Sequence, residues 1–253
     1  MAGLVGVFRL DGPSTERDRE LVSEMARATA EVPAQLAYQG HAGALSAAYI
    51  GYGFESQRAP EHCSGALRGS PEGGELDIVL AGYLYNDREV EALAAASGEG
   101  LLGGIAELYR RHGEAFVEHL QGRFWALVHD RREGRLVLAG DRFGHVPLYV
   151  RRTADRLIFA TGLMAHGVPS APPTSLDRSA VALYLMYRHF VGEGTYFREV
   201  KLASAATILR VDDAEVHERQ YWRYGLQEDP PWRSPEEDAD AMAEAFAEGM
   251  ERV

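Results

Sequence analysis

The sequence predicts an α+β domain in which short strands form layers and helices are grouped before and after them. Short apolar runs separated by turn-forming residues recur between positions 76 and 160, which is typical of antiparallel strands. Amphipathic helix patterns flank these runs on both sides, and the sequence contains no repeat of about 20–50 residues. With 253 residues, of which 46% are apolar, the chain can bury a sizeable core.

The first part of the chain predicts a strand, a helix and further strands. Residues 4–9 alternate weakly and predict a strand, and Thr15 with Asp18 resembles a capping box that begins a helix. The apolar, glycine-broken run 44–54 predicts strands joined by a tight turn. The segment 58–74 is rich in Pro, Gly and Ser and predicts a loop.

The middle of the chain carries the clearest strand patterns. Strands are predicted at 76–85, 124–128, 136–139, 147–150 and 157–160. Two helices are predicted between the first two of these strands, one over 87–96 and one with Ile105, Leu108 and Tyr109 on a single face that ends at Gly113.

The last part of the chain predicts a helix, a hairpin and a terminal helix. Thr174 and Asp177 resemble another helix start, which leads a helix with Val181, Tyr184, Leu185 and Phe190, and a hairpin follows over 206–211 and 216–221. After a linker with Pro230 and Pro231, Ser234 and Glu237 form a capping box with Pro235 in the first turn. The apolar stripe of this helix consists of Ala239, Met242, Ala243, Phe246, Met250 and Val253.

Composition excludes several classes of function. The net charge of −12 argues against a nucleic-acid partner, and no stretch approaches the ~18 apolar residues of a membrane helix. The sequence shows no secretory signal, and its one cysteine, Cys63, cannot form an internal disulfide, so we expect a cytoplasmic protein that binds no membrane. The nine histidines show no metal-ligand spacing, so no metal site is predicted.

Four separated motifs occur in the order found in one enzyme family. Residues 120–127 (LQGRFWAL) are similar to an L-x-G-x-F-A-F-A strand, and 138–149 (LAGDRFGHVPLY) to an R-D-x-x-G-x-x-P-L-Y signature, with Gly140 where an arginine is usual. Residues 195–202 and 220–222 resemble T-x-F-x-x-I-x-x-L and R-Y-W. These motifs resemble the N-terminal class II glutamine amidotransferase domain of asparagine synthetases.

The resemblance implies a fold and a domain organisation. The family's fold is a four-layer αββα sandwich of the N-terminal-nucleophile (Ntn) type, with two antiparallel sheets between helices. We expect this domain at 1–227 and, at 228–253, a linker with the first helix of a synthetase domain. The family's synthetase half is an ATP-pyrophosphatase domain with an S-G-G-x-D-S loop, and nothing in this sequence resembles it. ATP and Mg²⁺ are therefore expected only on a partner or missing synthetase domain, and no cofactor in this chain.

The positions that match the family's glutaminase site carry the wrong side chains. The thiol nucleophile of the second codon is replaced by Ala2, which has no atom that can attack an amide. The family's N-G-E-x-Y-N segment matches Ala81-Gly82-Tyr83-Leu84-Tyr85-Asn86, so the oxyanion-stabilising Asn is an alanine and only Gly82 remains. The acid that holds the glutamine amino group matches Leu101, and the arginine that grips its carboxylate matches Gln39.

A degenerate glutaminase site has parallels within the family. An engineered substitution would explain Ala2 alone but not the joint loss of four groups. In β-lactam synthetases and lasso-peptide cyclases, similar departures occur because an amine within the substrate attacks the ATP-activated carboxylate. The sequence therefore predicts a non-catalytic part of an amide- or lactam-forming enzyme, with no residue assigned to catalysis.

Alternatives remain open at this point. The chain could be a stand-alone module that binds a small molecule in the old pocket near Gly82, Tyr83, Tyr85 and Asn86. A hydrolase that uses Cys63 is a third hypothesis, although a cysteine in a Pro- and Gly-rich loop is more simply inert.

The terminal helix also leaves several partners open. Its stripe either docks on a synthetase domain, self-associates through Met242, Phe246 and Met250, or folds back on its own domain.

Overall fold

The computed structural model describes residues 3–30, 36–51, 75–93, 100–212, 215–225 and 234–251. One set of strands comprises β1 (Gly3–Arg9), β2 (Leu36–Ala42), β3 (Leu45–Gly51), β7 (Tyr149–Arg152), β8 (Arg156–Ala160) and β9 (Lys201–Leu202). The other comprises β4 (Leu76–Leu84), β5 (Gly122–Asp130), β6 (Arg135–Gly140), β10 (Thr207–Asp212) and β11 (Glu215–Gln220). The helices are α1 (Glu16–Thr29), α2 (Asp87–Ala92), α3 (Gly100–His112), α4 (Arg178–Tyr187) and α5 (Pro235–Glu251), with 3₁₀ turns η2 (Gly113–His119) and η3 (Leu163–Gly167).

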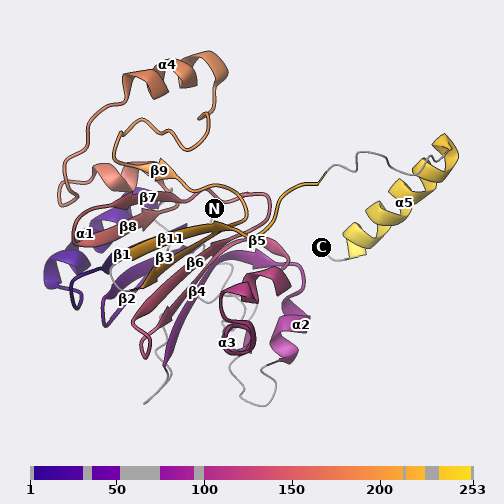
Figure 1. Cartoon of the computed structure of the whole chain (residues 1–253), viewed down its shortest axis with the longest axis horizontal. Coiled ribbons are helices and arrows are strands. Elements are labelled where there is room, and N and C mark those ends of the chain that lie inside the picture. Colours follow the sequence, from indigo (N-terminus) through magenta and orange to yellow (C-terminus); the bar gives the residue numbers. More distant parts are fainter. Residues whose placement is uncertain are drawn as a thin grey trace.

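The strands form two sheets whose paired neighbours are all antiparallel. Sheet A has the order β2-β3-β1-β8-β7-β9 and sheet B the order β11-β10-β6-β5-β4. Helix α1 contacts β1 and β3 of sheet A, whereas α3 contacts β4 of sheet B and packs on α2 and η2 (Figure 1). This arrangement confirms the predicted α+β sandwich of two antiparallel sheets between helices.

Because side chains alternate between the two faces of each sheet, the hydrophobic core is divided into three layers. In β4, Leu80 packs with the helices α2 and α3, while its neighbours Val79 and Ala81 point between the two sheets. The layer between the sheets also holds Leu4 and Trp125. Because successive side chains point to opposite faces, β4, β5, β6 and β10 of sheet B each contribute to two cores at once.

The predicted start of the first helix is confirmed in detail. The Thr15 N–H donates to Asp18 Oδ2 at 2.9 Å, and the Asp18 N–H donates to Thr15 Oγ1 at 3.3 Å, so both bonds of the capping box are present. Arg156 Nη1 also donates to Asp18 Oδ1 at 2.8 Å, which ties this end of α1 to β8. Burial and hydrogen bonding compete at Asp18, and the Thr15 bonds together with Arg156 leave its pKa lowered.

The structure differs from the sequence prediction around residues 36–54. The sequence analysis predicted no strand at β2, yet β2 pairs along its whole length with β3. Of the run 44–54, where strands with a tight turn were predicted, the structure shows β3 up to Gly51, and residues 52–54 lie outside the described residues. The predicted loop 58–74, with Cys63, lies outside the described residues.

Helix α4 begins later than predicted. Asp177 is its N-cap and accepts from the backbone N–H groups of Ser179 and Ala180 at 2.9 and 3.1 Å, so Thr174 precedes the cap. Phe190 lies beyond the helix, which ends at Tyr187. The αL conformation of Arg188 stops the helix before it reaches Phe190.

The terminal helix α5 forms as predicted but does not fold back. Ser234 and Glu237 make both capping-box bonds, at 2.7 and 3.2 Å. The helix extends away from the sandwich (Figure 1), and Met242, Phe246 and Met250 are exposed. Over the described ranges, no helix is both long and apolar enough to cross a membrane.

Candidate functional site

Gly82 is held where only glycine fits. Its φ is +127°, and a Cβ atom at this position would lie 2.0 Å from the backbone oxygen of Arg123 on β5. Strand β4 therefore approaches β5 more closely than a side chain would allow, which explains why this position carries a glycine. The adjacent Ala81 is fully buried and points between the sheets.

Three residues form a row across sheet B beside this glycine. Ala81 pairs with Trp125 across β4 and β5, and Trp125 pairs with Gly140 across β5 and β6. The indole is buried, and its Nε1–H donates to the Val146 carbonyl oxygen at 2.7 Å. A Cβ atom on Gly140 would lie 2.7 Å from Trp125 Cζ2, so the ring covers the place where a longer side chain would start.

This row is apolar where the related motifs carry polar side chains. The motifs quoted above carry Asn, Ala and Arg at the positions of Ala81, Trp125 and Gly140. Here the two polar side chains are absent and an indole fills the middle of the row. The inner face of sheet B thus presents apolar surface at the position matched to the oxyanion donor. An oxyanion donor has to present a polar N–H or O–H group, and the methyl side chain of Ala81 has none.

The exposed Tyr83, the partly buried Tyr85 and an arginine lie at the end of the same strands. The rings of Tyr83 and Tyr85 meet edge to face with centroids 5.6 Å apart. Arg123 Nε donates to Tyr85 Oη at 3.1 Å. Burial, followed by a hydrogen bond with Tyr85, raises the pKa of Tyr83. Tyr83 and Tyr85 thus lie together beside a cation, Arg123, that sequence reasoning did not single out.

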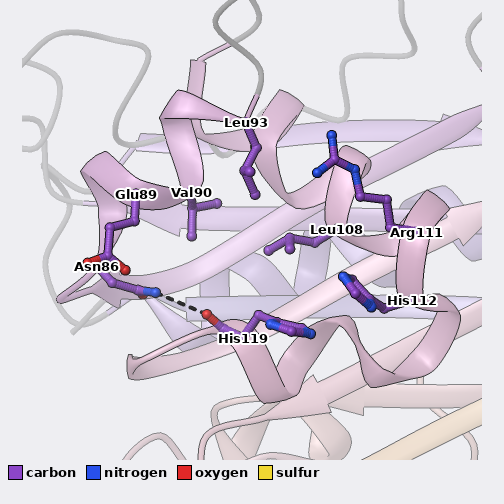
Figure 2. A pocket seen from close by; sticks show the side chains of 8 residues that line it. All are labelled: Asn86, Glu89, Val90, Leu93, Leu108, Arg111, His112 and His119. Carbon is purple, nitrogen blue, oxygen red and sulfur yellow. Dashed lines mark hydrogen bonds between the residues drawn. The ribbon is translucent and has the colours of Figure 1, made fainter.

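Asn86 is used for structure rather than left free for a ligand. Its Nδ2 donates to the His119 carbonyl oxygen at 3.0 Å, and its Oδ1 accepts from the Gln121 backbone N–H at 3.0 Å. The side chain therefore ties the β4–α2 junction to the connection between η2 and β5. Figure 2 shows the first of these bonds at the edge of a pocket.

That pocket, of about 300 Å³, lies among the helices outside sheet B. Its lining residues are Asn86, Glu89, Val90, Leu93, Leu108, Arg111, His112 and His119 (Figure 2). The imidazoles of His112 and His119 are stacked with centroids 4.2 Å apart. Val90 and Leu108 belong to the core beneath α2 and α3, whereas Ala81 belongs to the core between the sheets. The pocket therefore lies on the opposite side of sheet B from Ala81, although the matched residue Asn86 lines it.

The two matched substrate grips are also placed apart from Ala81. Leu101 is buried with Val90 in the core outside sheet B, on the opposite side of that sheet from Ala81. Gln39 lies on β2, where its Nε2 donates to the Arg19 carbonyl oxygen at 2.9 Å and its Oε1 accepts from Ser23 Oγ at 2.7 Å. The side-chain amide of Gln39 thus anchors α1.

Two candidate nucleophile positions, Ala2 and Cys63, lie outside the described residues. Strand β1 begins at Gly3, and the Leu4 N–H donates to Thr161 Oγ1 at 3.0 Å beside β8. The most informative residue that sequence reasoning missed is Trp125. Its signal was a tryptophan at an alanine position of the quoted strand motif.

The Asp141–His145 turn is architectural. Asp141 accepts from the backbone N–H groups of Phe124, Phe143 and His145 and from His145 Nδ1, at 2.9–3.3 Å. Next to it, Tyr221 Oη donates to the Gly140 carbonyl oxygen at 2.9 Å. Burial raises the pKa of Tyr221 to about 12. Within the described part of the chain, no group of three or more His, Cys, Asp or Glu side chains is placed to hold a metal ion.

Sequence comparison identifies relatives of this arrangement. Residues 70–222 match the family of glutamine amidotransferase domains. Asparagine synthetase [glutamine-hydrolyzing] 2 of Bacillus subtilis is 24% identical over 64% of this chain and 21% of its own length. Asparagine synthetase [glutamine-hydrolyzing] of Triphysaria versicolor is 34% identical over 31% of this chain and 14% of its own length. The chain thus spans about a fifth or less of these relatives.

Structural comparison agrees on the fold. Glutamine phosphoribosylpyrophosphate amidotransferase from B. subtilis superposes with a TM-score of 0.57 and 12% identity, over 88% of this chain and 50% of that one. The four layers, the match over 70–222 and the asparagine synthetase relatives all point to one family. The chain belongs to the class II glutamine amidotransferase domain family, with the Ntn-type fold and with asparagine synthetases among its relatives.

Proposed function

We propose that this domain does not hydrolyse glutamine and acts as the non-catalytic part of an asparagine synthetase-type, ATP-dependent amide- or lactam-forming enzyme. The observation that carries the proposal is the apolar row Ala81–Trp125–Gly140 across sheet B. The row replaces an oxyanion donor by a methyl group and covers the neighbouring space with an indole. A substrate amide placed there would meet apolar surface where charge has to develop.

The groups that are absent from this sequence are those that glutamine hydrolysis requires. Hydrolysis needs a nucleophile that attacks the amide carbon and a base that accepts its proton. The methyl side chain of Ala2 supplies no lone pair for attack. Loss of one oxyanion donor alone costs about 3 kcal/mol of transition-state stabilisation. Without either group, glutamine bound in this fold would remain intact.

The proposed partner is an ATP-dependent synthetase domain or protein. Support comes from the asparagine synthetase relatives, of which this chain spans only a small part. ATP and Mg²⁺ would bind to that partner. In the proposed reaction, a substrate carboxylate is activated with release of pyrophosphate, an amine nitrogen attacks the activated carbonyl carbon, and AMP leaves. Because the amine belongs to a substrate, no ammonia from glutamine is required.

Ammonia release tests the proposal directly. Purified protein incubated with glutamine should release ammonia at the rate of a buffer blank, and a glutamine-hydrolysing asparagine synthetase serves as the positive control. Calorimetry with Mg-ATP should give no saturable heat, because the sequence contains no phosphate-cradling loop. Glutamine-dependent ammonia above the blank would overturn the first part of the proposal, and micromolar ATP binding would overturn the second.

A second candidate function is supported by the exposed cluster of Tyr83, Tyr85 and Arg123. A guanidinium beside two tyrosines suits a small carboxylate that carries an apolar or aromatic group. In this alternative the domain binds a small molecule by itself. Saturable binding of such a carboxylate to the wild type, and its loss in Arg123→Ala, would favour this function over the structural one.

A further inference from the structure

The face of α5 that carries its apolar stripe has no partner among the described residues. Met242, Phe246 and Met250 have 74, 71 and 63% of their surface exposed, and they lie four residues apart along one side of the helix. Isolated exposed apolar residues are ordinary, but a row of three large ones on a single helix is typical of an interaction surface. The opposite face of α5 is acidic.

A second unpartnered helix face occurs on α4. None of the residues of α4 is buried. The ring of Tyr184 packs on Phe190 and Tyr196 with centroids 5.2 and 5.0 Å apart, and this side attaches the helix to the domain. The other side presents Met186 with 73% and Tyr187 with 51% of the surface exposed, next to the half-exposed Leu183.

The two helices have complementary charges. Every charged residue of α5 from Pro235 to Glu251 is acidic. In α4, by contrast, the segment from Arg178 to the C-cap Arg188 contains no acidic residue and carries an arginine at each end. Ten residues separate these arginines, which is about 15 Å along a helix, and α5 is long enough to span both. An α5 helix laid on α4 would therefore pair acids with arginines around an apolar seam.

We propose that α5 of one copy of this chain docks on α4 of a second copy, and that the exchange is reciprocal. Figure 1 shows α4 and α5 at opposite ends of the molecule, which favours a contact between copies over one within a copy. Each chain offers one α5 face and one α4 face, so a two-fold dimer covers both kinds of surface and leaves neither open. This inference concerns assembly alone and does not depend on the loss of glutamine hydrolysis.

Sedimentation of the whole chain over a range of concentrations tests the proposal. The wild type should be a dimer. Phe246→Asp removes the docking face of α5, and Met186→Asp removes its receptor on α4, so each variant should weaken dimerisation at least tenfold. Met164→Asp, at another exposed methionine on η3 with 64% of its surface exposed, is the matched control and should remain dimeric. Far-UV circular dichroism checks that every variant stays folded.

Mixing the two monomeric variants gives the decisive result. The Met186→Asp chain keeps an intact α5, and the Phe246→Asp chain keeps an intact α4. Their mixture should therefore form a heterodimer held by one of the two seams, although each variant alone is monomeric. A monomeric wild type overturns the proposal. A Met186→Asp variant that dimerises like the wild type also overturns it, since α5 would then pair with another surface, such as a second α5 helix. A mixture that stays monomeric overturns the reciprocal exchange.

Discussion

Trp125 and Gly140 are cross-strand partners in which the indole of one covers the α-carbon of the other. A Cβ atom at position 140 would lie 2.7 Å from Trp125 Cζ2, closer than real Cβ contacts allow. The ring is fixed by its hydrogen bond to the Val146 carbonyl oxygen. The motifs quoted in the sequence analysis carry an arginine at the position of Gly140 and an alanine at the position of Trp125. The two departures from the motif therefore form a single exchange of side-chain volume across β5 and β6.

The contact between Trp125 and Gly140 predicts that the stability losses of two substitutions at these positions are not additive. Gly140→Arg should destabilise the protein by about 1–3 kcal/mol, because the new side chain collides with a buried indole. Trp125→Ala should cost about 3–5 kcal/mol through the cavity it leaves. In the double variant the arginine can use that space, so the combined loss should be smaller than the sum by about 1 kcal/mol or more. Urea denaturation of the four proteins measures the coupling, and strictly additive losses would show that the side chains do not exclude one another.

A second prediction concerns pH and His166. Burial lowers the pKa of His166 to about 4, and its Nε2 is hydrogen-bonded to the Tyr149 carbonyl oxygen, while its buried Nδ1 has no hydrogen-bond partner among the residues that the structure describes. The unfolded chain binds the proton near pH 6.5, so between pH 6.5 and 4 the unfolded state holds more protons than the folded state. The stability that His166 contributes is therefore complete above pH 6.5 and is lost as the pH falls toward 4.

The pH dependence should disappear when the imidazole is removed. The difference in unfolding free energy between wild type and His166→Gln should shrink by about 2–3 kcal/mol from pH 7 to pH 4. His217→Gln, at a histidine whose side chain has 46% of its surface exposed, serves as the control for the loss of an imidazole at the surface. A His166→Gln profile parallel to that of the wild type would show that this histidine is not the group that titrates.

Local signals in the sequence predicted those parts of the fold that local chemistry determines. A capping box is a local motif of four consecutive residues. The starts of α1 and α5 could therefore be predicted from Thr15–Asp18 and Ser234–Glu237. Strand β2 escaped prediction because Gln39, Gly40 and His41 interrupt any apolar alternation. It exists because β3 pairs with it along its whole length. That pairing is a tertiary contact, which the sequence of β2 does not encode alone.

The candidate site was predictable in part, for the same reason. Matching motifs located Ala81 and Gly82, and the structure places both on β4 beside β5. Nothing in the linear order indicated that Trp125 and Gly140 would meet, since only the register of β5 against β6 brings them together. Matching by motif also placed Leu101 at the site, but in the structure Leu101 lies on the other side of sheet B from Ala81.

A third prediction tests why Gly82 is kept. Gly82→Ala should cost more than about 2 kcal/mol, because the φ of +127° strains any side chain and the added Cβ would meet the Arg123 backbone oxygen. Gly134→Ala is the matched control, since φ is also positive there but nothing lies within 4 Å of the added atom. The control should cost about 1 kcal/mol, the usual penalty for a left-handed residue. Equal losses would mean that backbone strain alone, and not the approach of β5, requires glycine at position 82.

The last prediction concerns restoring the nucleophile. Ala2→Cys should leave ammonia release from glutamine at the level of the blank, provided mass spectrometry shows that Met1 has been removed and the α-amino group is free. A thiolate at position 2 would still lack the oxyanion donor of the quoted motif, because the matched position is Ala81, which pairs with the buried Trp125. Adding Ala81→Asn should not suffice either, because Trp125 and Gly140 keep the rest of the row apolar. Glutamine turnover by Ala2→Cys within tenfold of an ordinary enzyme rate of ~10 s⁻¹ would show that the pocket is intact and that only its nucleophile had been lost.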